Sequence, residues 1–428
     1  MKRPRLRAYL GLGLLAAGLC GLALSGDLLQ HPERLWAFYG LSLAGFGLLA
    51  SAAASLPLRV ALVAAVIVRL LFLPGVPSLS DDFYRYLWDG RVQLAGEDPY
   101  LYAPADPRLD GVAFAGRANI NHPGLRTVYP PLEQAAFLGV AAASDAAGRL
   151  AGAGEQAAGA GDAAGVTAGD AAAGAVRRGL LALKLVAGAA DLLTAAAVWW
   201  LAGNKRRRQA TVLYLLCPAI IVQTWESAHL EVVAVGLAVL AAGLLVRGRD
   251  WQGGVALGLA AACRLTPAGL LVPALLGGRA KPTRFLAGFI PALVIPYVPY
   301  LLRGGAFGSL WQSGIAWTGG SLLFSLLTIA LSPQIARLLC LAVFVAGAVL
   351  IARRLRGRPR TAEAFAWTLT LLVICLPVVH AWYWLMPLTF GLVAGVWLPV
   401  VLGLAAPLPE ALTTRWPRGH AWTILSRR

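Results

Sequence analysis

The sequence predicts an all-α polytopic membrane protein. Of its 428 residues 58% are hydrophobic and only 13% are charged, whereas about a quarter of the residues are charged in water-soluble domains. Apolar stretches of roughly 17 to 25 residues, enough to cross a bilayer as a helix, alternate with short basic loops. We therefore expect one domain, 1–428, with about twelve membrane segments.

The basic residues lie at the ends of the apolar stretches, although the net charge of +17 alone would also suit a nucleic-acid-binding protein. This placement is typical of Lys and Arg kept on the cytoplasmic side against anionic lipid. Stacking aromatics are not interleaved with them, so we expect the lipid bilayer, and no nucleic acid, as partner. The clusters are Lys2–Arg7, Lys205–Arg208, Arg247 with Arg249, Arg279–Arg284, Arg353–Arg360 and Arg415–Arg428.

The cysteines and the N-terminus add little to this picture. The five cysteines lie singly in apolar segments without metal-ligand spacing, so neither a disulfide nor a cysteine metal site is predicted. The apolar run Tyr9–Ser25 after a basic N-terminus has the form of a signal peptide. Because so many further spans follow, we expect an uncleaved first helix.

The first half of the chain predicts three helices and a large loop. Residues 8–26, 36–56 and 58–75 are the helices, and they place residues 78–131 outside the cytoplasm. Residues 131–143 are apolar but too short to cross, so we expect a re-entrant or interfacial helix. Residues 144–176 are rich in Ala and Gly and predict a flexible insertion. Residues 179–202 then return to the Lys205–Arg208 cluster.

The second half alternates regularly. Residues 209–224, 229–247, 251–263, 266–277 and 283–302 are expected to cross in turn, with a broken helix around Cys263–Pro267. After the loop 303–320, residues 321–331 are expected to be interfacial, because a crossing there would place Arg353–Arg360 outside. Residues 334–352, 362–379 and 382–404 complete the bundle before a basic cytoplasmic tail, 405–428. This alternation brings Asp81, Asp82, Glu226, His229, Arg264 and His380 to one membrane face.

The loop 78–131 is the longest polar, charged segment of the chain, and we interpret it as the catalytic loop. Ser78-x-x-Asp81 resembles a capping box, and Asp81, Arg85 and Asp89 would share a helix face. Pairs of this kind on a surface contribute only a few tenths of a kcal/mol. Adjacent carboxylates beside a bilayer can also act as a general base or hold a divalent cation. We favour function and leave open whether Asp81 or Asp82 is the base.

Ionisable residues interrupt the later apolar segments. Glu226 and His229 are three residues apart, and such groups at membrane depth either serve function or mark a helix end; zinc would need a third ligand. Arg264 would bind a lipid phosphate or pair with Glu226 or Glu231.

Aromatic residues gather in His380–Trp384 and at Trp311 and Trp317. They are typical of interfacial anchors, but anchoring does not explain His380. The sequence contains no P-loop, GxSxG, Rossmann or HExxH motif.

The segment Asp81–Arg91, followed by Glu97–Tyr100 and Tyr129–Pro131, resembles the first outer loop of GT-C glycosyltransferases. More narrowly, it resembles bacterial polyprenyl-phosphate-mannose-dependent mannosyltransferases, including glycosyltransferase family 87. The resemblance extends over roughly residues 75–390. Its later motifs are Glu226–Glu231, Arg264–Pro267 and His380–Trp384.

The resemblance implies a GT-C-like bundle that transfers a sugar from a lipid-phosphate donor on the non-cytoplasmic side. The loop aspartate of the family acts at the acceptor hydroxyl, and Asp81 or Asp82 matches it. Glu231 and Arg264 stand where the family more usually has aspartate and lysine. The expected substrate-binding residues are Arg85, Asp89, Tyr129, Glu226, His229, Arg264, His380 and Tyr383.

We therefore expect an inner (plasma) membrane glycosyltransferase that moves a hexose, by resemblance mannose, from a polyprenyl-phosphate donor to an extracytoplasmic glycan or glycolipid acceptor. No cofactor is expected beyond a divalent cation at Asp81 and Asp82. A transporter or flippase for lipid-linked sugar is the alternative, and it would show inverted repeats that the two halves of the sequence lack. A glycan polymerase or ligase differs only in donor size and stays open.

Overall fold

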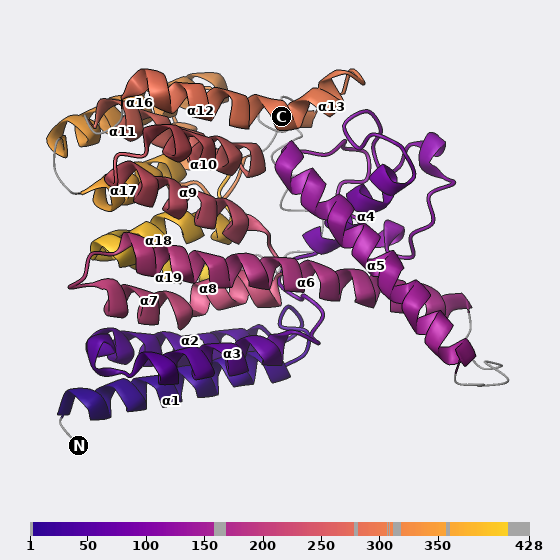
Figure 1. The fold of residues 1–428 in the computed structure, drawn as a ribbon, viewed down its shortest axis with the longest axis horizontal. Coiled ribbons are helices and arrows are strands. Elements are labelled where there is room, and N and C mark those ends of the chain that lie inside the picture. Colours follow the sequence, from indigo (N-terminus) through magenta and orange to yellow (C-terminus); the bar gives the residue numbers. More distant parts are fainter. Residues whose placement is uncertain are drawn as a thin grey trace.

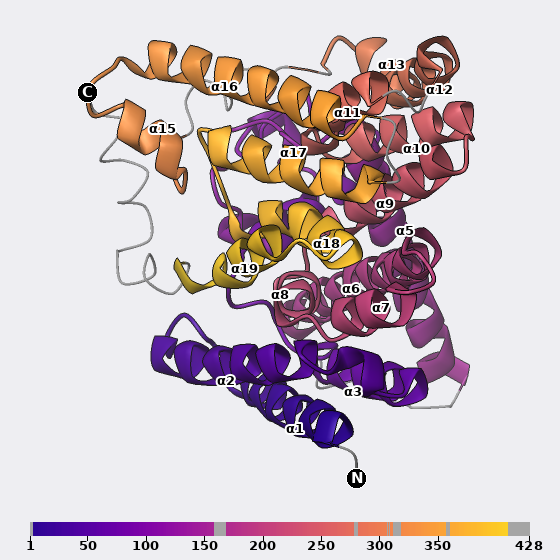
Figure 2. The same cartoon turned by 90° about the vertical axis from the view of Figure 1, so that its left-hand side faces the viewer.

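The computed structural model describes residues 3–157, 168–277, 281–305, 307, 309–310, 318–356 and 360–409. Figure 1 shows a bundle of roughly aligned helices, with α4, α5 and their loops gathered beyond one end of it, and Figure 2 shows the same bundle from its side. The helices of the first half are α1 (Arg3–Leu24), α2 (Pro32–Ala50), η1 (Ala53–Ser55), α3 (Leu58–Phe72), α4 (Asp82–Leu94), η2 (Pro107–Leu109), η3 (Arg117–Asn119), α5 (Pro131–Ala157) and α6 (Ala168–Leu201). Those that follow are α7 (Arg207–Leu215), α8 (Pro218–Ile221), η4 (Val222–Glu226), α9 (Glu231–Val246), α10 (Asp250–Cys263), η5 (Thr266–Leu270), α11 (Leu271–Leu276), α12 (Pro282–Val294), η6 (Ile295–Tyr297), α13 (Val298–Leu301), α15 (Leu322–Leu327), α16 (Pro333–Arg354), α17 (Thr361–Cys375), η7 (Ala381–Trp384), α18 (Leu385–Ala394) and α19 (Trp397–Ala405).

The all-α membrane fold is confirmed, whereas the count of about twelve segments stays a prediction. Four stretches in the described part of the chain are long and apolar enough to cross a bilayer. Others, such as Glu231–Val246 and Thr361–Cys375, are apolar but shorter. The four long stretches are Arg3–Leu24, Ala172–Leu201, Pro282–Leu301 and Pro333–Arg354.

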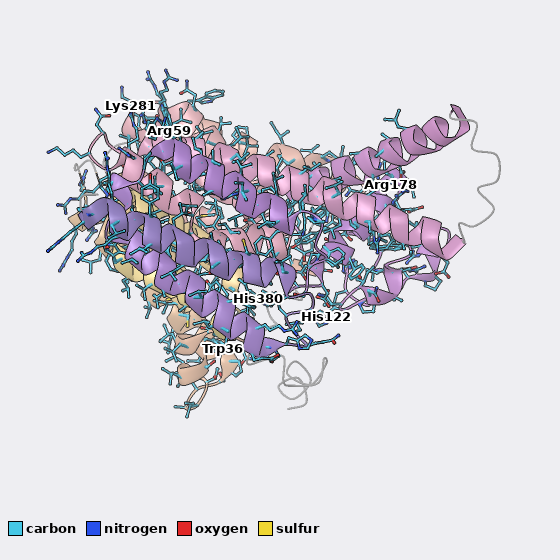
Figure 3. All side chains as sticks on the ribbon, turned by 90° about the horizontal axis from the view of Figure 1, so that it is seen from below. Trp36, Arg59, His122, Arg178, Lys281 and His380 are labelled. Atoms are coloured by element: carbon cyan, nitrogen blue, oxygen red, sulfur yellow. The ribbon has the colours of Figure 1, made fainter. Side chains whose placement is uncertain are left out.

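The two ends of the bundle differ in charge and chemistry. Figure 3 shows Arg59 and Lys281 at one end and His122 and His380 towards the other. Arg59 and Lys281 belong to starts of apolar helices, α3 and α12. Which end faces the cytoplasm stays a prediction from the distribution of basic residues.

The Ala/Gly-rich segment 144–176 differs from expectation. Its described residues are helical: α5 continues to Ala157, and α6 already begins at Ala168. Alanine is the strongest helix former, and contact between α5 and α6 adds packing that the low-complexity sequence did not suggest. The predicted thirteen-residue interfacial helix at 131–143 is therefore the start of a 27-residue helix, while 158–167 lie outside the described residues.

Two segments that were expected to be continuous helices are interrupted, and further predictions fall outside the described residues. Residues 382–404 form η7, α18 and α19, because the chain turns at Gly395 with a φ of +77°. A side chain there would collide with the guanidinium of Arg206. Residues 209–224 break at Cys217–Pro218 and end in a π-helical turn, Val222–Glu226. The tail beyond residue 409 and the tryptophans at 311 and 317 lie outside the described residues.

A buried ion pair joins α3 to the middle of the bundle. Arg69 Nε lies 2.7 Å from Asp191 Oδ2, and the two side chains are 3% and 0% exposed. Tyr214 and Trp225 donate hydrogen bonds to the same carboxylate, at 2.9 and 3.0 Å. Arg69 also donates to the carbonyl oxygen of Leu215 at 2.7 Å. One carboxylate thus connects α3, α6, α7 and η4, and removal of its cation would leave a buried charge unpaired.

We expect Arg69→Met to destabilise the fold by about 3–5 kcal/mol, because Asp191 loses its counter-ion in a dry site. Thermal unfolding in detergent checks this, with Arg59→Met on the exposed face of the same helix as the matched control. Arg69→Met combined with Asp191→Leu is expected to regain part of the loss. Equal unfolding temperatures for Arg69→Met and Arg59→Met would contradict the assignment.

Candidate active site

The first residues of the loop 78–131 are hydrogen-bonded to the buried carboxylate of Glu226. Glu226 Oε1 accepts hydrogen bonds from the backbone N–H of Ser78 at 2.7 Å, from its hydroxyl at 2.8 Å and from the N–H of Leu79 at 3.2 Å. Nearby, Lys184 donates to the carbonyl oxygens of Phe72 and Gly75 at 2.7 Å. Glu226, expected to bind substrate, therefore anchors the link between α3 and α4.

The expected capping box is wrong, because Ser78 is bound to Glu226. The helix α4 begins at Asp82, after Asp81 at the N-cap, and the Asp81 side chain does not cap it; the Ser80 hydroxyl accepts the Asp82 N–H at 3.3 Å. The amide of Asn121 donates to both aspartates, at 2.8 Å to Asp81 and 3.0 Å to Asp82. Asp81 is exposed and Asp82 is half-buried, so the two carboxylates, though adjacent in sequence, face different surroundings.

Arg85 and Asp89 stabilise the loop from inside. They form the expected i,i+4 pair on α4, with 2.8 Å between Arg85 Nε and Asp89 Oδ1, and both are nearly fully buried. Gln134 donates to the other oxygen of Asp89 at 2.8 Å and to the Thr127 hydroxyl at 2.7 Å. Arg85 in turn donates to the Leu125 carbonyl at 3.0 Å. These contacts fix residues 125–127 against α4 and α5.

A hydrogen bond from Tyr100 fixes the backbone at Tyr129. The Tyr100 hydroxyl donates to the Tyr129 carbonyl at 2.5 Å, and the N–H of Thr127 donates to the Pro99 carbonyl at 3.1 Å. The Tyr129 ring lies edge-on to Tyr86, with 5.0 Å between centroids. Burial, followed by the negative charge of Asp82, raises the pKa of both Tyr86 and Tyr129. The charge of Asp82 therefore acts on both tyrosine rings.

Arg264 lies at the centre of the site. The chain is extended there, between α10 and η5, as the expected helix break requires. Arg264 NH2 lies 2.8 Å from Glu133 Oε1 and Nε lies 3.0 Å from Glu231 Oε2; the second contact is an ion pair without hydrogen-bond geometry. The guanidinium carbon is 5.3 Å from the centroid of the Tyr129 ring. The pairing with Glu231 considered from the sequence is thus present, and Glu133 is a second partner.

Two imidazoles flank one indole beside this arginine. The ring centroids of His229 and Trp382 are 3.9 Å apart, and those of His380 and Trp382 are 4.4 Å apart with parallel planes. The Tyr86 hydroxyl lies 3.1 Å from His229 Nδ1. Ala228, immediately before His229, has a φ of +58°, a conformation that costs a non-glycine residue about 1–2 kcal/mol. Such strain is concentrated at functional sites.

Burial sets the protonation of this cluster at the end of the bundle. Burial, followed by the positive charge of Arg264, lowers the pKa of His380 to about 4, so its imidazole is neutral at pH 7. Burial also raises the pKa of Glu133 to about 8, with Arg264 opposing the rise. Glu133 is therefore mainly protonated at pH 7. Burial raises the pKa of Glu231 as well, and Arg264 again opposes the rise.

Several buried polar atoms around Arg264 have no hydrogen-bond partner in the described part of the chain. They are His229 Nε2, Glu133 Oε2, Glu231 Oε2 and Arg264 Nε. Buried polar groups are normally hydrogen-bonded, so a cluster of exceptions requires an explanation. If the Tyr86 hydroxyl donates to Nδ1, His229 Nε2 carries the proton and is a donor. Donors and acceptors of this kind suit the oxygens of a sugar or a phosphate.

The residues expected to form one site therefore divide into two groups. Asp82 and Arg264 both act on the pKa of Tyr129 and of Tyr383, and the charge of Arg264 also acts on His229 and His380. The loop and its anchor hold Asp81, Arg85, Asp89 and Glu226 in place. Sequence reasoning missed Tyr86, Asn121, Glu133, Gln134 and Trp382; the proximity of Glu133 to the Tyr129–Pro131 motif was the available signal.

A metal site gains no support from the geometry. Among the residues that the structure describes, no three His, Cys, Asp or Glu side chains are grouped to hold an ion. A divalent cation at Asp81 and Asp82 would need further oxygen ligands, for which a substrate phosphate is chemically suited.

We expect the fold to lose stability as the pH rises towards 8, because Glu133 binds its proton more tightly folded than unfolded. Its pKa is about 8 in the fold against an ordinary 4.5, so the slope is up to about 1.4 kcal/mol per pH unit between these values. Glu133→Gln removes this slope, whereas Glu33→Gln, at an exposed side chain, retains it. Unfolding temperatures measured from pH 5 to 9 check the expectation, and parallel curves for wild type and Glu133→Gln would refute it.

The comparison with known protein families agrees with this geometry. The sequence model of glycosyltransferase family 87 matches residues 170–380, a segment that includes Glu226, His229, Arg264 and His380. No curated protein matches the chain. The match confirms the resemblance seen in the sequence and is consistent with a GT-C-like membrane glycosyltransferase; it covers just under half of the chain and does not include the loop 78–131.

Proposed function

We propose that the protein transfers a hexose, by resemblance mannose, from a polyprenyl-phosphate donor to a glycan or glycolipid acceptor on the extracytoplasmic side of the inner (plasma) membrane. The observation that carries the proposal is the set of buried polar atoms around Arg264 that have no hydrogen bond to the described part of the chain, close to Glu133, on which Asp82 acts electrostatically. A dry, polar site at that depth suits a lipid-borne substrate whose reacting group stands at the membrane surface.

Asp82 is the better candidate for the base. It is half-buried and acts on Tyr86, Tyr129 and Glu133, whereas Asp81 is exposed. In the proposed step the Asp82 carboxylate takes the proton of the acceptor hydroxyl, and the acceptor oxygen bonds to the anomeric carbon of the donor. The bond from that carbon to the phosphate oxygen breaks, and its electron pair leaves with the polyprenyl phosphate.

Arg264 and the neutral His229 are suited to the leaving phosphate. Arg264 carries the positive charge of the cluster, and Glu133, when protonated, does not compete for it. His229 Nε2 supplies a hydrogen-bond donor in a site shielded from water, where stabilisation of developing charge is strong.

The proposal is tested by transfer itself. We expect the purified full-length protein in nanodiscs to move radiolabelled mannose from polyprenyl-phosphate-mannose to a glycolipid extract, giving a new covalent product. A transporter or flippase would instead change the leaflet of the labelled donor without forming a product. Appearance of label only in the opposite leaflet would replace the proposed function by transport.

Asp82→Asn is expected to lower the transfer rate by a factor of about 10²–10⁴, because general base catalysis contributes that much. Asp81→Asn is the matched control, since it alters the neighbouring carboxylate and the same Asn121 contact. We expect Asp81→Asn to retain activity within about tenfold of wild type. The reverse order of the two variants would assign the base to Asp81, and unchanged rates in both would remove the proposed base.

A further inference from the structure

A second cavity lies apart from the Arg264 cluster, between α4, α5, α6 and the loop 113–115. Its volume is about 510 Å³, within the usual range of ligand sites. Leu87, Phe114 and Val176 contribute apolar surface, and the remaining wall consists largely of Ala and Gly. We call it the α4–α6 groove.

The charged residues that line the groove favour an anion. They are Arg91, Arg149, Arg178 and Asp145. Arg91 and Asp145 pair at 2.6 Å, so the lining carries two further arginines that this carboxylate does not balance. Arg178 Nε is buried and has no hydrogen-bond partner among the residues that the structure describes. Arginine presents a fork of donors that matches the oxygens of a phosphate group.

Exposed apolar side chains lie on α6 beyond the residues that line the groove. Arg178 belongs to the candidate span Ala172–Leu201, close to the end from which α6 extends beyond the bundle (Figures 1 and 3). Leu181 and Leu185 follow on the same helix face, at i+3 and i+7, and are 43% and 53% exposed. An acyl chain lying along this face would bring its headgroup to Arg178.

We propose that the α4–α6 groove binds the phosphate group of an anionic lipid, with its acyl chains along α6. This inference concerns a site other than the one for glycosyl transfer and does not depend on that activity. The bound phosphate would bridge Arg149 on α5 and Arg178 on α6, beside Arg91 on α4. It would thereby hold the helix whose first residue is Asp82.

The test measures binding of phosphatidylglycerol to the full-length protein in phosphatidylcholine nanodiscs. Each charge-assisted contact contributes about tenfold to affinity, so we expect Arg149→Gln and Arg178→Gln each to weaken binding about tenfold. Arg177→Gln is the matched control, because Arg177 is the exposed neighbour on the same helix and does not line the groove. Asp145→Asn is expected to strengthen binding, because it removes the carboxylate and releases Arg91.

The outcomes distinguish a specific lipid site from non-specific attraction of anionic lipid to basic side chains on the surface. Equal weakening by Arg177→Gln and Arg178→Gln would overturn it. Displacement of phosphatidylglycerol by inorganic phosphate at similar concentration would assign the groove to a soluble phosphate ester and overturn the lipid assignment. Gel filtration monitors folding; if either arginine variant misfolds, the sign of the Asp145→Asn effect decides, and weaker or unchanged binding refutes the proposal.

Discussion

The site depends on keeping one guanidinium charged in surroundings that exclude water. Burial of a charge is costly unless partners surround it, and Arg264 has Glu133 from α5 and Glu231 from α9 at 2.8 and 3.0 Å. To reach both, the chain must leave α10 at Cys263 and run extended for a residue. The helix break, the inward start of α5 and the position of α9 are therefore consequences of one electrostatic requirement.

The same requirement sets the chemistry that the cluster can perform. With Asp82, Glu133 and Glu231 all ionised, a single arginine would face an excess of negative charge, and a phosphate would be repelled. Burial moves the pKa of Glu133 to about 8 and so reduces that excess at neutral pH. The two histidines are held neutral by the same lack of water, which leaves their nitrogens available for hydrogen bonds rather than for charge.

Sequence reasoning predicted the helical membrane fold, because apolar length identifies helices that can cross a bilayer. From the placement of basic residues it also predicted that Asp81, Asp82, Glu226, His229, Arg264 and His380 come to one membrane face, which stays a prediction. It could not separate Asp81 from Asp82, which differ only in the direction of their side chains from α4. It missed Glu133, since an acidic residue in a first helical turn is ordinarily explained by the helix dipole. The helicity of 144–157 was missed because its Ala/Gly-rich composition was interpreted as a flexible insertion, although alanine is a strong helix former and the neighbouring helix α6 packs against α5.

The helix α4 connects the parts of this end of the molecule. Asp82 begins it, Tyr86 contacts the His229 imidazole, Arg85 and Asp89 fix the loop, and Arg91 lines the groove. Gly90 allows close approach to α5, where a side chain would collide with the backbone of Phe137. A rotation of α4 would therefore move the candidate base and the loop together. Contacts that hold α4 against α5 and α6 act on the geometry of the Arg264 cluster even when they lie well away from it.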